Sequence, residues 1–82
     1  MKVRDYPEAN EFIVGTVKKV KNFGAFVTLE EYPGREGFVH ISEVASGWVK
    51  YIGDYVREGQ RTVFKVLGVD ESKGHIDLSL KD

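Results

Sequence analysis

The sequence lacks cysteine, has little proline and carries almost no net charge. Its 82 residues include no Cys and two Pro, and 12 Lys and Arg against 13 Asp and Glu give a formal net charge of −1. Without cysteine, the chain is not one of the small secreted scaffolds that depend on disulfides. With so little net charge, any contact with nucleic acid must come from local patches and not from the surface as a whole.

Long hydrophobic runs are also absent. No apolar run exceeds four residues, far short of the ~20 that a membrane-spanning helix needs, and the charged start MKVRDYPEAN lacks the apolar core of a signal peptide. These absences predict a cytoplasmic protein with no membrane partner. The length suits one domain, and an apolar content of 41% with five Phe, four Tyr and one Trp is enough for a folded core.

Alternation of apolar and polar residues, which is typical of strands, dominates from Phe12 onward. Five stretches show it: residues 13–20, 24–29, 37–41, 61–69 and 75–80. The pair Lys18-Lys19 shifts the phase of the first stretch, as a bulge would. Residues 42–58 lack alternation and predict a long connection with one or two short helical turns. We predict an all-β, five-stranded antiparallel Greek-key barrel with its longest connection between strands 3 and 4.

The alternation also predicts which side chains face outward. Phe26, Phe38 and His40 are expected on the outer face of the second and third strands. In the fifth strand, Ile76, Leu78 and Leu80 are expected inward and His75, Asp77 and Ser79 outward. Residues 1–11 are expected to form an arm of uncertain order, and residues 12–82 the barrel domain, which we expect to be a fragment of a longer subunit because the chain stops directly after the last strand.

Three segments, NFGAFVTL, GFVHISEV and VFKVLGVDESKGHIDLSLKD, resemble the S1 RNA-binding domain, a variant of the OB-fold barrel. The longer run EEYPGREGFVHISEVASGWVKYIGDYVREGQ is similar to the amino-terminal domain of archaeal alpha subunits of translation initiation factor 2. This resemblance implies a non-catalytic RNA-binding module that supports GTP-dependent delivery of initiator methionyl-tRNA to the small ribosomal subunit. In that family the gamma subunit binds GTP, and the present sequence has no phosphate-binding loop of its own.

Candidate RNA-binding residues follow from the resemblance and from residue type. The resemblance implies that Phe23, Phe26 and His40 line the RNA surface, where an exposed ring can stack on a base. Basic residues interleave with these rings in sequence, so a backbone could run beside them. The predicted set is Phe23, Phe26, His40, Lys19, Lys21, Lys50 and His75. We expect Phe38 to cover a barrel end or to pack under the long connection.

The predicted RNA contact is weak. His75 stands where S1 domains often have Arg, and Asp77 faces the same way, so phosphate is neutralised poorly there. We therefore expect contact with tRNA, mRNA or rRNA only when other parts of the factor hold the domain nearby. An isolated monomer with no metal, no cofactor and no catalytic residues is expected, because two His and four Ser form no recognisable nucleophile-base or ligand pattern.

A second interpretation rests on the long connection. Trp48, Tyr51 and Tyr55, spaced near one helical turn, are expected to cap the open end of the barrel, but they could instead form a protein-docking surface. Eukaryotic members of the family carry a regulatory phosphoserine in this connection. The matching position here is Ala45, which argues against such a switch. An S1 domain of another RNA-processing factor is a further alternative.

Overall fold

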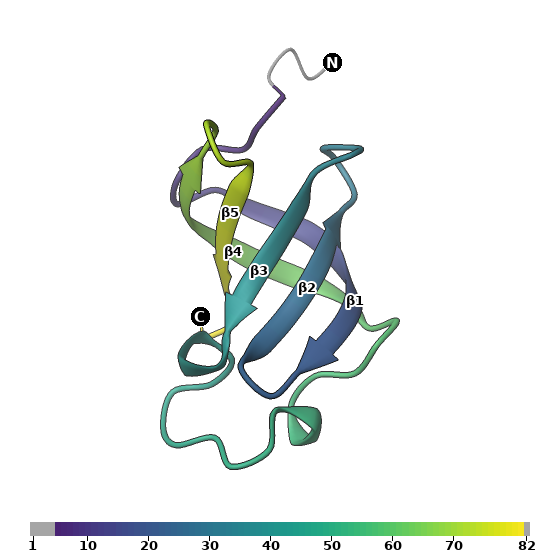
Figure 1. Cartoon of the computed structure of the whole chain (residues 1–82), viewed down its shortest axis with the longest axis vertical. Coiled ribbons are helices and arrows are strands. Elements are labelled where there is room, and N and C mark those ends of the chain that lie inside the picture. The colour runs from purple at the N-terminus through teal and green to yellow at the C-terminus, as the bar shows by residue number, and fades with distance from the viewer. Residues whose placement is uncertain (1–4, 82) are drawn as a thin grey trace.

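The computed structural model describes residues 5–81 and contains five strands and two short 3-10 helices (Figure 1). The strands are β1 (Phe12–Lys21), β2 (Gly24–Leu29), β3 (Glu36–His40), β4 (Arg61–Asp70) and β5 (His75–Ser79). The helices η1 (Ile41–Glu43) and η2 (Ile52–Asp54) lie in the connection between β3 and β4. The predicted all-β class and the five strand positions are confirmed, with bounds that differ by at most one residue.

The strands close into a barrel in the order β1-β2-β3-β5-β4, with β4 and β1 completing the ring. All neighbours are antiparallel except β3 and β5, which are parallel. The expectation of an entirely antiparallel barrel is therefore wrong for this one pair. The reason is parity, because strand direction cannot alternate around a closed ring with an odd number of strands.

The core is the barrel interior, and it is built from the inward positions of the alternating strands. Val27, Val39 and Val66 are fully buried, and the other buried core residues are Ile13, Val17, Ala25, Leu29, Tyr32, Val44, Ile52, Val56, Phe64, Ile76 and Leu78. One expectation for β5 is wrong, since Ser79 is buried and not outward. Regular alternation ends there because β5 ends, and the Ser79 hydroxyl accepts a hydrogen bond from the Lys81 N–H at 3.2 Å.

The bulge predicted at Lys18-Lys19 is present. Val17 pairs with Val27, but Lys19 pairs with Phe26, so Lys18 is the extra residue. One inserted residue changes which side chains face outward, because the side-chain period of a strand is two. The bulge therefore places Lys19 on the same outer face as Phe26. A second register shift, between Val66 and Gly68 of β4, interrupts the pairing of β4 with β5.

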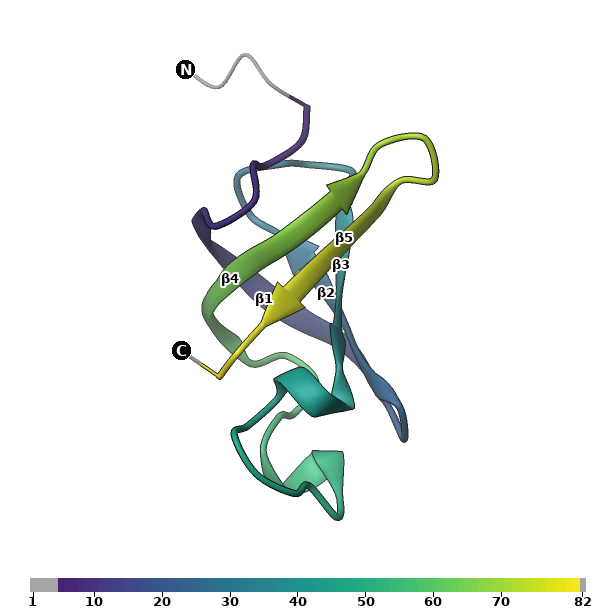
Figure 2. The same cartoon turned by 90° about the vertical axis from the view of Figure 1, so that its left-hand side faces the viewer.

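The connection between β3 and β4 lies at one end of the barrel, opposite the β4–β5 turn (Figures 1 and 2). Its aliphatic side chains Val44, Ile52 and Val56 are buried and close this end. The expectation that the aromatic residues cap it is wrong, because Trp48 is 82% exposed and Tyr51 is 63% exposed. In the part of the chain that the structure describes, no helix has the length and apolarity needed to cross a bilayer.

The segment before β1 is attached to the barrel from Asp5 onward. The Asn10 N–H donates to the Val66 carbonyl at 2.6 Å, and the Val66 N–H donates to the Glu11 carbonyl at 2.8 Å. The Tyr6 ring packs against the core and lies 4.1 Å from the Arg35 guanidinium carbon. Residues 1–4 of the expected arm lie outside the described residues.

Candidate nucleic-acid interface

Three phenylalanine rings form a cluster on the outer face of β2 and β3. Phe26 and Phe38 are direct cross-strand partners, with ring centroids 5.2 Å apart. Phe23, in the β1–β2 turn, contacts both, at 6.4 Å from Phe26 and 5.8 Å from Phe38. Phe23 is 54% exposed, and the other two rings are half-buried. Because these rings pack on one another and still face solvent, they are preorganised for stacking.

Gly24 makes room for this cluster. A side chain at this position would meet the Phe38 ring and the Val39 carbonyl oxygen. The Phe38 ring therefore lies directly over bare backbone, which fixes its height above the sheet. The expectation that Phe38 covers a barrel end or packs under the long connection is wrong, because Phe38 packs on the outer face of β2 and β3 against Phe23 and Phe26.

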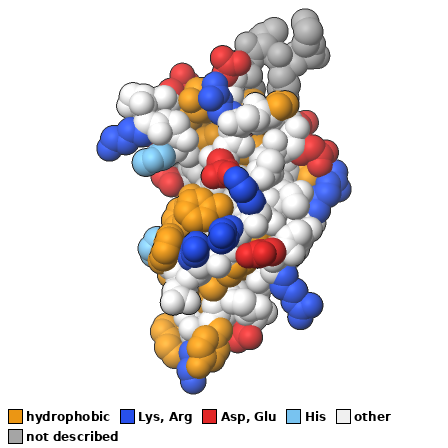
Figure 3. Space-filling view, turned by 45° about the vertical axis from the view of Figure 1, so that its right-hand side comes forward, with side chains coloured by type: hydrophobic (Ala, Val, Ile, Leu, Met, Phe, Trp, Pro, Cys, Tyr) orange, Lys and Arg blue, Asp and Glu red, His pale blue; other side chains and the backbone are white. Residues whose placement is uncertain are grey.

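An open groove of about 440 Å³ lies beside the rings and extends onto β5. We call it the aromatic groove; it is lined by Phe23, Phe26, Glu36, Gly37, Phe38, Gly74, His75, Ile76 and Asp77. The parallel β3–β5 pair brings these residues together, since Phe38 is the register partner of Asp77. Figure 3 shows hydrophobic side chains gathered on this face, with basic side chains beside them and histidine at the border.

The basic side of the aromatic groove is on β1. Lys19 pairs with Phe26 and Lys21 with Gly24, so both lysines share the face of the rings. Their neighbour Lys18 forms an ion pair with Glu36, with the Nζ and Oε2 atoms 2.7 Å apart. Lys19 and Lys21 are exposed and stand where a phosphate backbone could pass.

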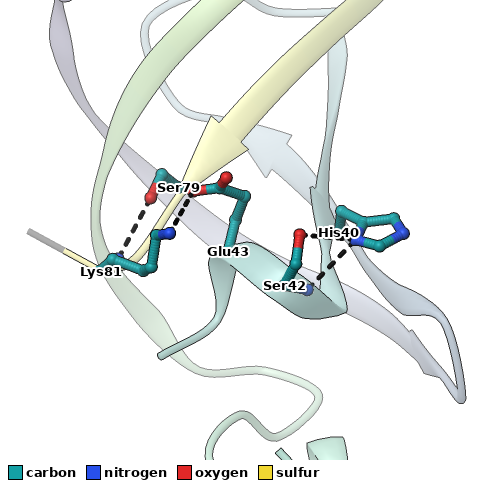
Figure 4. A network of polar contacts seen from close by, with 5 residues as sticks. All are labelled: His40, Ser42, Glu43, Ser79 and Lys81. Carbon is teal, nitrogen blue, oxygen red and sulfur yellow. Dashed lines mark hydrogen bonds and ion pairs between the residues drawn. The ribbon is translucent and has the colours of Figure 1, made fainter. Parts of the chain in front are cut away.

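His40 extends the interface at the end of β3. Its ring centroid lies 6.4 Å from that of Phe38. Its Nδ1 atom accepts a hydrogen bond from the Ser42 N–H at 3.1 Å and lies 2.8 Å from the Ser42 hydroxyl (Figure 4). Because a backbone N–H only donates, Nδ1 is the acceptor and the ring proton sits on Nε2. His40 therefore offers an N–H donor on the ring side away from Ser42.

The helix η1 holds three parts of the interface in place. The Ile41 N–H donates to the Phe23 carbonyl at 2.9 Å, and Ser42 orients His40. The Glu43 carbonyl accepts from the Leu80 N–H at 2.9 Å, and the Glu43 carboxylate lies 3.7 Å from the Lys81 Nζ (Figure 4). The alternation of polar and apolar residues does not predict contacts of this kind. Sequence reasoning therefore missed the role of Ser42, and it also missed the role of Gly24 under the Phe38 ring. The signal available was a Ser two residues after an outward His, at a strand end.

The β4–β5 turn presents His75 at the far end of the groove. A hydrogen bond from the Ser72 hydroxyl to Asp70 at 2.7 Å, helped by the backbone N–H of Lys73, holds the pKa of the Asp70 carboxyl below its ordinary value. Asp70 is also the register partner of His75. Asp70 thus acts as the turn's hydrogen-bond acceptor.

Of the seven predicted residues, the structure brings six to this face and leaves one apart. Phe23, Phe26 and His75 line the groove, and His40, Lys19 and Lys21 border it. Lys50 lies in the β3–β4 connection with its Nζ 5.5 Å from the centre of the Tyr51 ring. Residues 5–81 contain no cluster of three or more carboxylate or imidazole groups arranged to hold a metal ion.

A family model described as "S1 RNA binding domain" matches residues 6–81. The chain belongs to the S1 RNA-binding domain family. The resemblance stated from the sequence motifs is therefore confirmed, and the barrel with its aromatic face is the barrel of an S1 domain.

Comparison with named relatives shows which S1 domains this chain resembles. The chain is 65% identical over 80 residues to the translation initiation factor 2 subunit alpha of Pyrococcus furiosus, which covers 98% of this chain and 29% of that protein. It matches the crystal structure of the intact alpha subunit of aIF2 from Pyrococcus abyssi with a TM-score of 0.93 and 62% identity, over 96% of this chain and 30% of that one.

A third match is a complex. It is the crystal structure of an a/eIF2alpha-aDim2p-rRNA complex from Pyrococcus horikoshii OT3, with a TM-score of 0.90 and 63% identity over 93% of this chain and 45% of that one. The chain thus spans about three-tenths of the length of the alpha subunits it matches. The suspected identification as the S1 part of an archaeal alpha subunit is confirmed.

Proposed function

We propose that this chain is the RNA-contacting S1 module of an initiation factor 2 alpha subunit. In this role it would support GTP-dependent delivery of initiator methionyl-tRNA to the small ribosomal subunit, in the cytoplasm and without catalysis of its own. The observation that carries the proposal is the aromatic groove, where three packed rings face solvent beside Lys19 and Lys21.

The chemistry of the groove favours single-stranded RNA. Rings stack on bases of any sequence, and each stacked base contributes about 1 to 3 kcal/mol. The lysines add phosphate contacts on one side only, while Asp77 and Glu36 line the other part of the groove. With a net charge of −1, the whole surface adds no further attraction for RNA, so binding by the isolated chain should be weak.

Weak binding suffices if the rest of the subunit holds the module near its target. Linking two binding modules raises the effective concentration of the second contact to about the millimolar range. The relatives are more than three times longer than the matched region, and their other parts would supply contacts with the remaining subunits. The RNA itself would be tRNA, mRNA or rRNA; the relative in the P. horikoshii complex was crystallised with rRNA.

An amide chemical-shift titration of the 82-residue chain with a short single-stranded RNA tests this function. We expect shifts to cluster on residues 19–26 and on His40, and to fade as salt rises, because the lysine contacts are screened. Absence of any shift at millimolar RNA would overturn the proposal.

A second candidate function is protein docking through the β3–β4 connection. The exposure of Trp48, Tyr51 and Tyr55 favours it, since large exposed aromatic residues are common at the centre of protein interfaces. The same chain and the same spectra test this candidate when a partner subunit replaces RNA. Shifts confined to residues 48–55 would support docking, and unchanged spectra would remove it.

A further inference from the structure

A second hollow of about 360 Å³ adjoins the aromatic groove and shares Phe38 and Asp77 with it. It also includes His40, Leu67 and Gly68 in its lining. We propose that this second hollow is a base-edge subsite that favours guanine over uracil. The inference rests on the proposed RNA-binding function and adds a base preference to it.

Gly68 is the first observation behind this subsite. A glycine inside a strand weakens the strand, and it often marks a bulge, a tight bend, or a close approach of a ligand or of another backbone. Gly68 has no positive φ, and a Cβ built on it would meet nothing within 4 Å. Gly68 adjoins the register shift between β4 and β5, and in contrast to Gly24 it has no neighbouring atom that would exclude a side chain. The bare surface instead leaves room for a flat ligand.

The charges around the hollow decide which part of a nucleotide it takes. Asp77 faces outward on β5, and no hydrogen bond or ion pair engages its carboxylate within residues 5–81. Glu43 lies at the same hollow, with its carboxylate directed to Lys81. Carboxylates repel phosphate, and the lysines stand on the opposite side, on β1. The backbone would therefore run along β1 and β2, with the base edge pointing toward β5.

The hydrogen-bonding groups select among bases. A carboxylate only accepts hydrogen bonds, while Nε2–H of His40 donates one. Guanine presents two adjacent donors, N1–H and the N2 amino group, next to the O6 acceptor. Uracil presents a single N3–H between two carbonyl oxygens, which would face the Asp77 carboxylate unfavourably. The second hollow therefore matches guanine better than uracil.

The test compares two single strands bound to the 82-residue chain: an all-uridine oligonucleotide and the same strand with one central guanosine. Fluorescence anisotropy at fixed salt should show about tenfold tighter binding of the guanosine strand, at the lower end of the discrimination given by a good bidentate contact. Asp77→Asn should abolish this preference because an amide oxygen and an amino group cannot accept both bonds. Gly68→Val should abolish it by filling the hollow, while Gly53→Ala in η2 should not.

The outcomes separate the subsite from the function. Equal affinity of the parent chain for both strands would overturn the subsite and leave RNA binding in place. A guanosine preference that survives Asp77→Asn would also overturn it, whether or not Gly68→Val folds. If neither strand binds, the RNA-binding function fails, and the subsite falls with it.

Discussion

The molecule exposes aromatic rings in two regions that are built differently. In the aromatic groove, Phe26 and Phe38 stand on paired strands, and Phe23 contacts both rings from the β1–β2 turn. In the β3–β4 connection, Trp48, Tyr51 and Tyr55 are exposed, and the Tyr51 ring lies beside the Lys50 ammonium group. Strand pairing fixes Phe26 and Phe38 before any ligand arrives, and Phe23 packs on both of them. The rings of the connection lie outside the sheet and gain no such order from it.

Charge separates the two regions as well. Around the groove, Lys19 and Lys21 lie on one side, and acids gather toward β5. Along residues 48–58 of the connection, Lys50 and Arg57 alternate with Asp54 and Glu58, so the charges of these four residues cancel. The two regions thus differ in more than the exposure of their aromatic residues, because the groove combines rings that contact one another with lysines on one side.

The largest expected effect comes from breaking the order of the groove. Gly24→Val would push a branched side chain into the Phe38 ring and the Val39 carbonyl. Overpacking of this kind costs typically 1 to 3 kcal/mol, and we expect about 3 because backbone cannot move aside. Urea unfolding measures the loss. Gly53→Ala in the connection, where a Cβ has open space, should change stability by less than about 0.5 kcal/mol; similar losses in both variants would contradict the role given to Gly24.

Removing one ring from the groove should lower RNA affinity, whereas removing one ring from the connection should not. Phe26→Ala should weaken binding of a short single-stranded RNA about tenfold, since it deletes one stacking platform, and should cost only about 1 kcal/mol of stability because the ring is half-buried. Trp48→Ala is the matched variant and should leave RNA affinity unchanged. Anisotropy titrations measure both affinities. Unfolding of Phe26→Ala would show that this ring belongs to the core.

A smaller effect is expected in the salt dependence. Each phosphate contact on a single strand contributes about −0.7 to the slope of log K against log salt. The double variant Lys19→Gln, Lys21→Gln should therefore flatten the slope by about 1.4. Lys50→Gln should leave it unchanged, since Lys50 lies away from the groove. A flattening by Lys50→Gln as large as that of the double variant would move the backbone path to the connection.

Strand alternation predicted most of this fold because each strand buries one face. It placed Val39 and Leu78 inside and Phe26 and His75 outside, and the doubled lysine marked the bulge. The parallel β3–β5 pair was also within reach, because five strands in a closed ring force one parallel pair. Ser79 was misplaced because period-two reasoning continues past the point where a strand ends.

The connection resisted prediction because turns have no period. Three apolar side chains of moderate size, Val44, Ile52 and Val56, close the barrel end, and residue type alone favoured the larger rings for that task. Lys50 was grouped with the RNA-binding residues by its charge and not by its position. The hydrogen bonds of Ser42 to His40 depend on the turn geometry of η1, and the alternation of polar and apolar residues does not express that geometry.

The smallest expected effect concerns acid stability at the β4–β5 turn, which presents His75 to the groove. Hydrogen bonds from Ser72 and the Lys73 N–H lower the pKa of Asp70 from its ordinary 3.8. As pH falls through 3.8 toward that lowered pKa, the unfolded chain takes up the proton before the folded chain does, so stability held at higher pH is lost. Glu30, bonded to Arg61, has a pKa lowered from 4.5 and adds loss of the same sign.

Urea unfolding as a function of pH should therefore show a decline below about pH 4.5 that is shallower in Asp70→Asn than in the parent chain. Ser72→Ala removes the main cause of the lowered pKa and should flatten the profile in the same direction. Because Asp70 is fully exposed, screening by solvent keeps the effect small. If the profiles of the parent chain and Asp70→Asn run parallel, the Asp70 carboxylate does not stabilise the β4–β5 turn, and the backbone alone holds it.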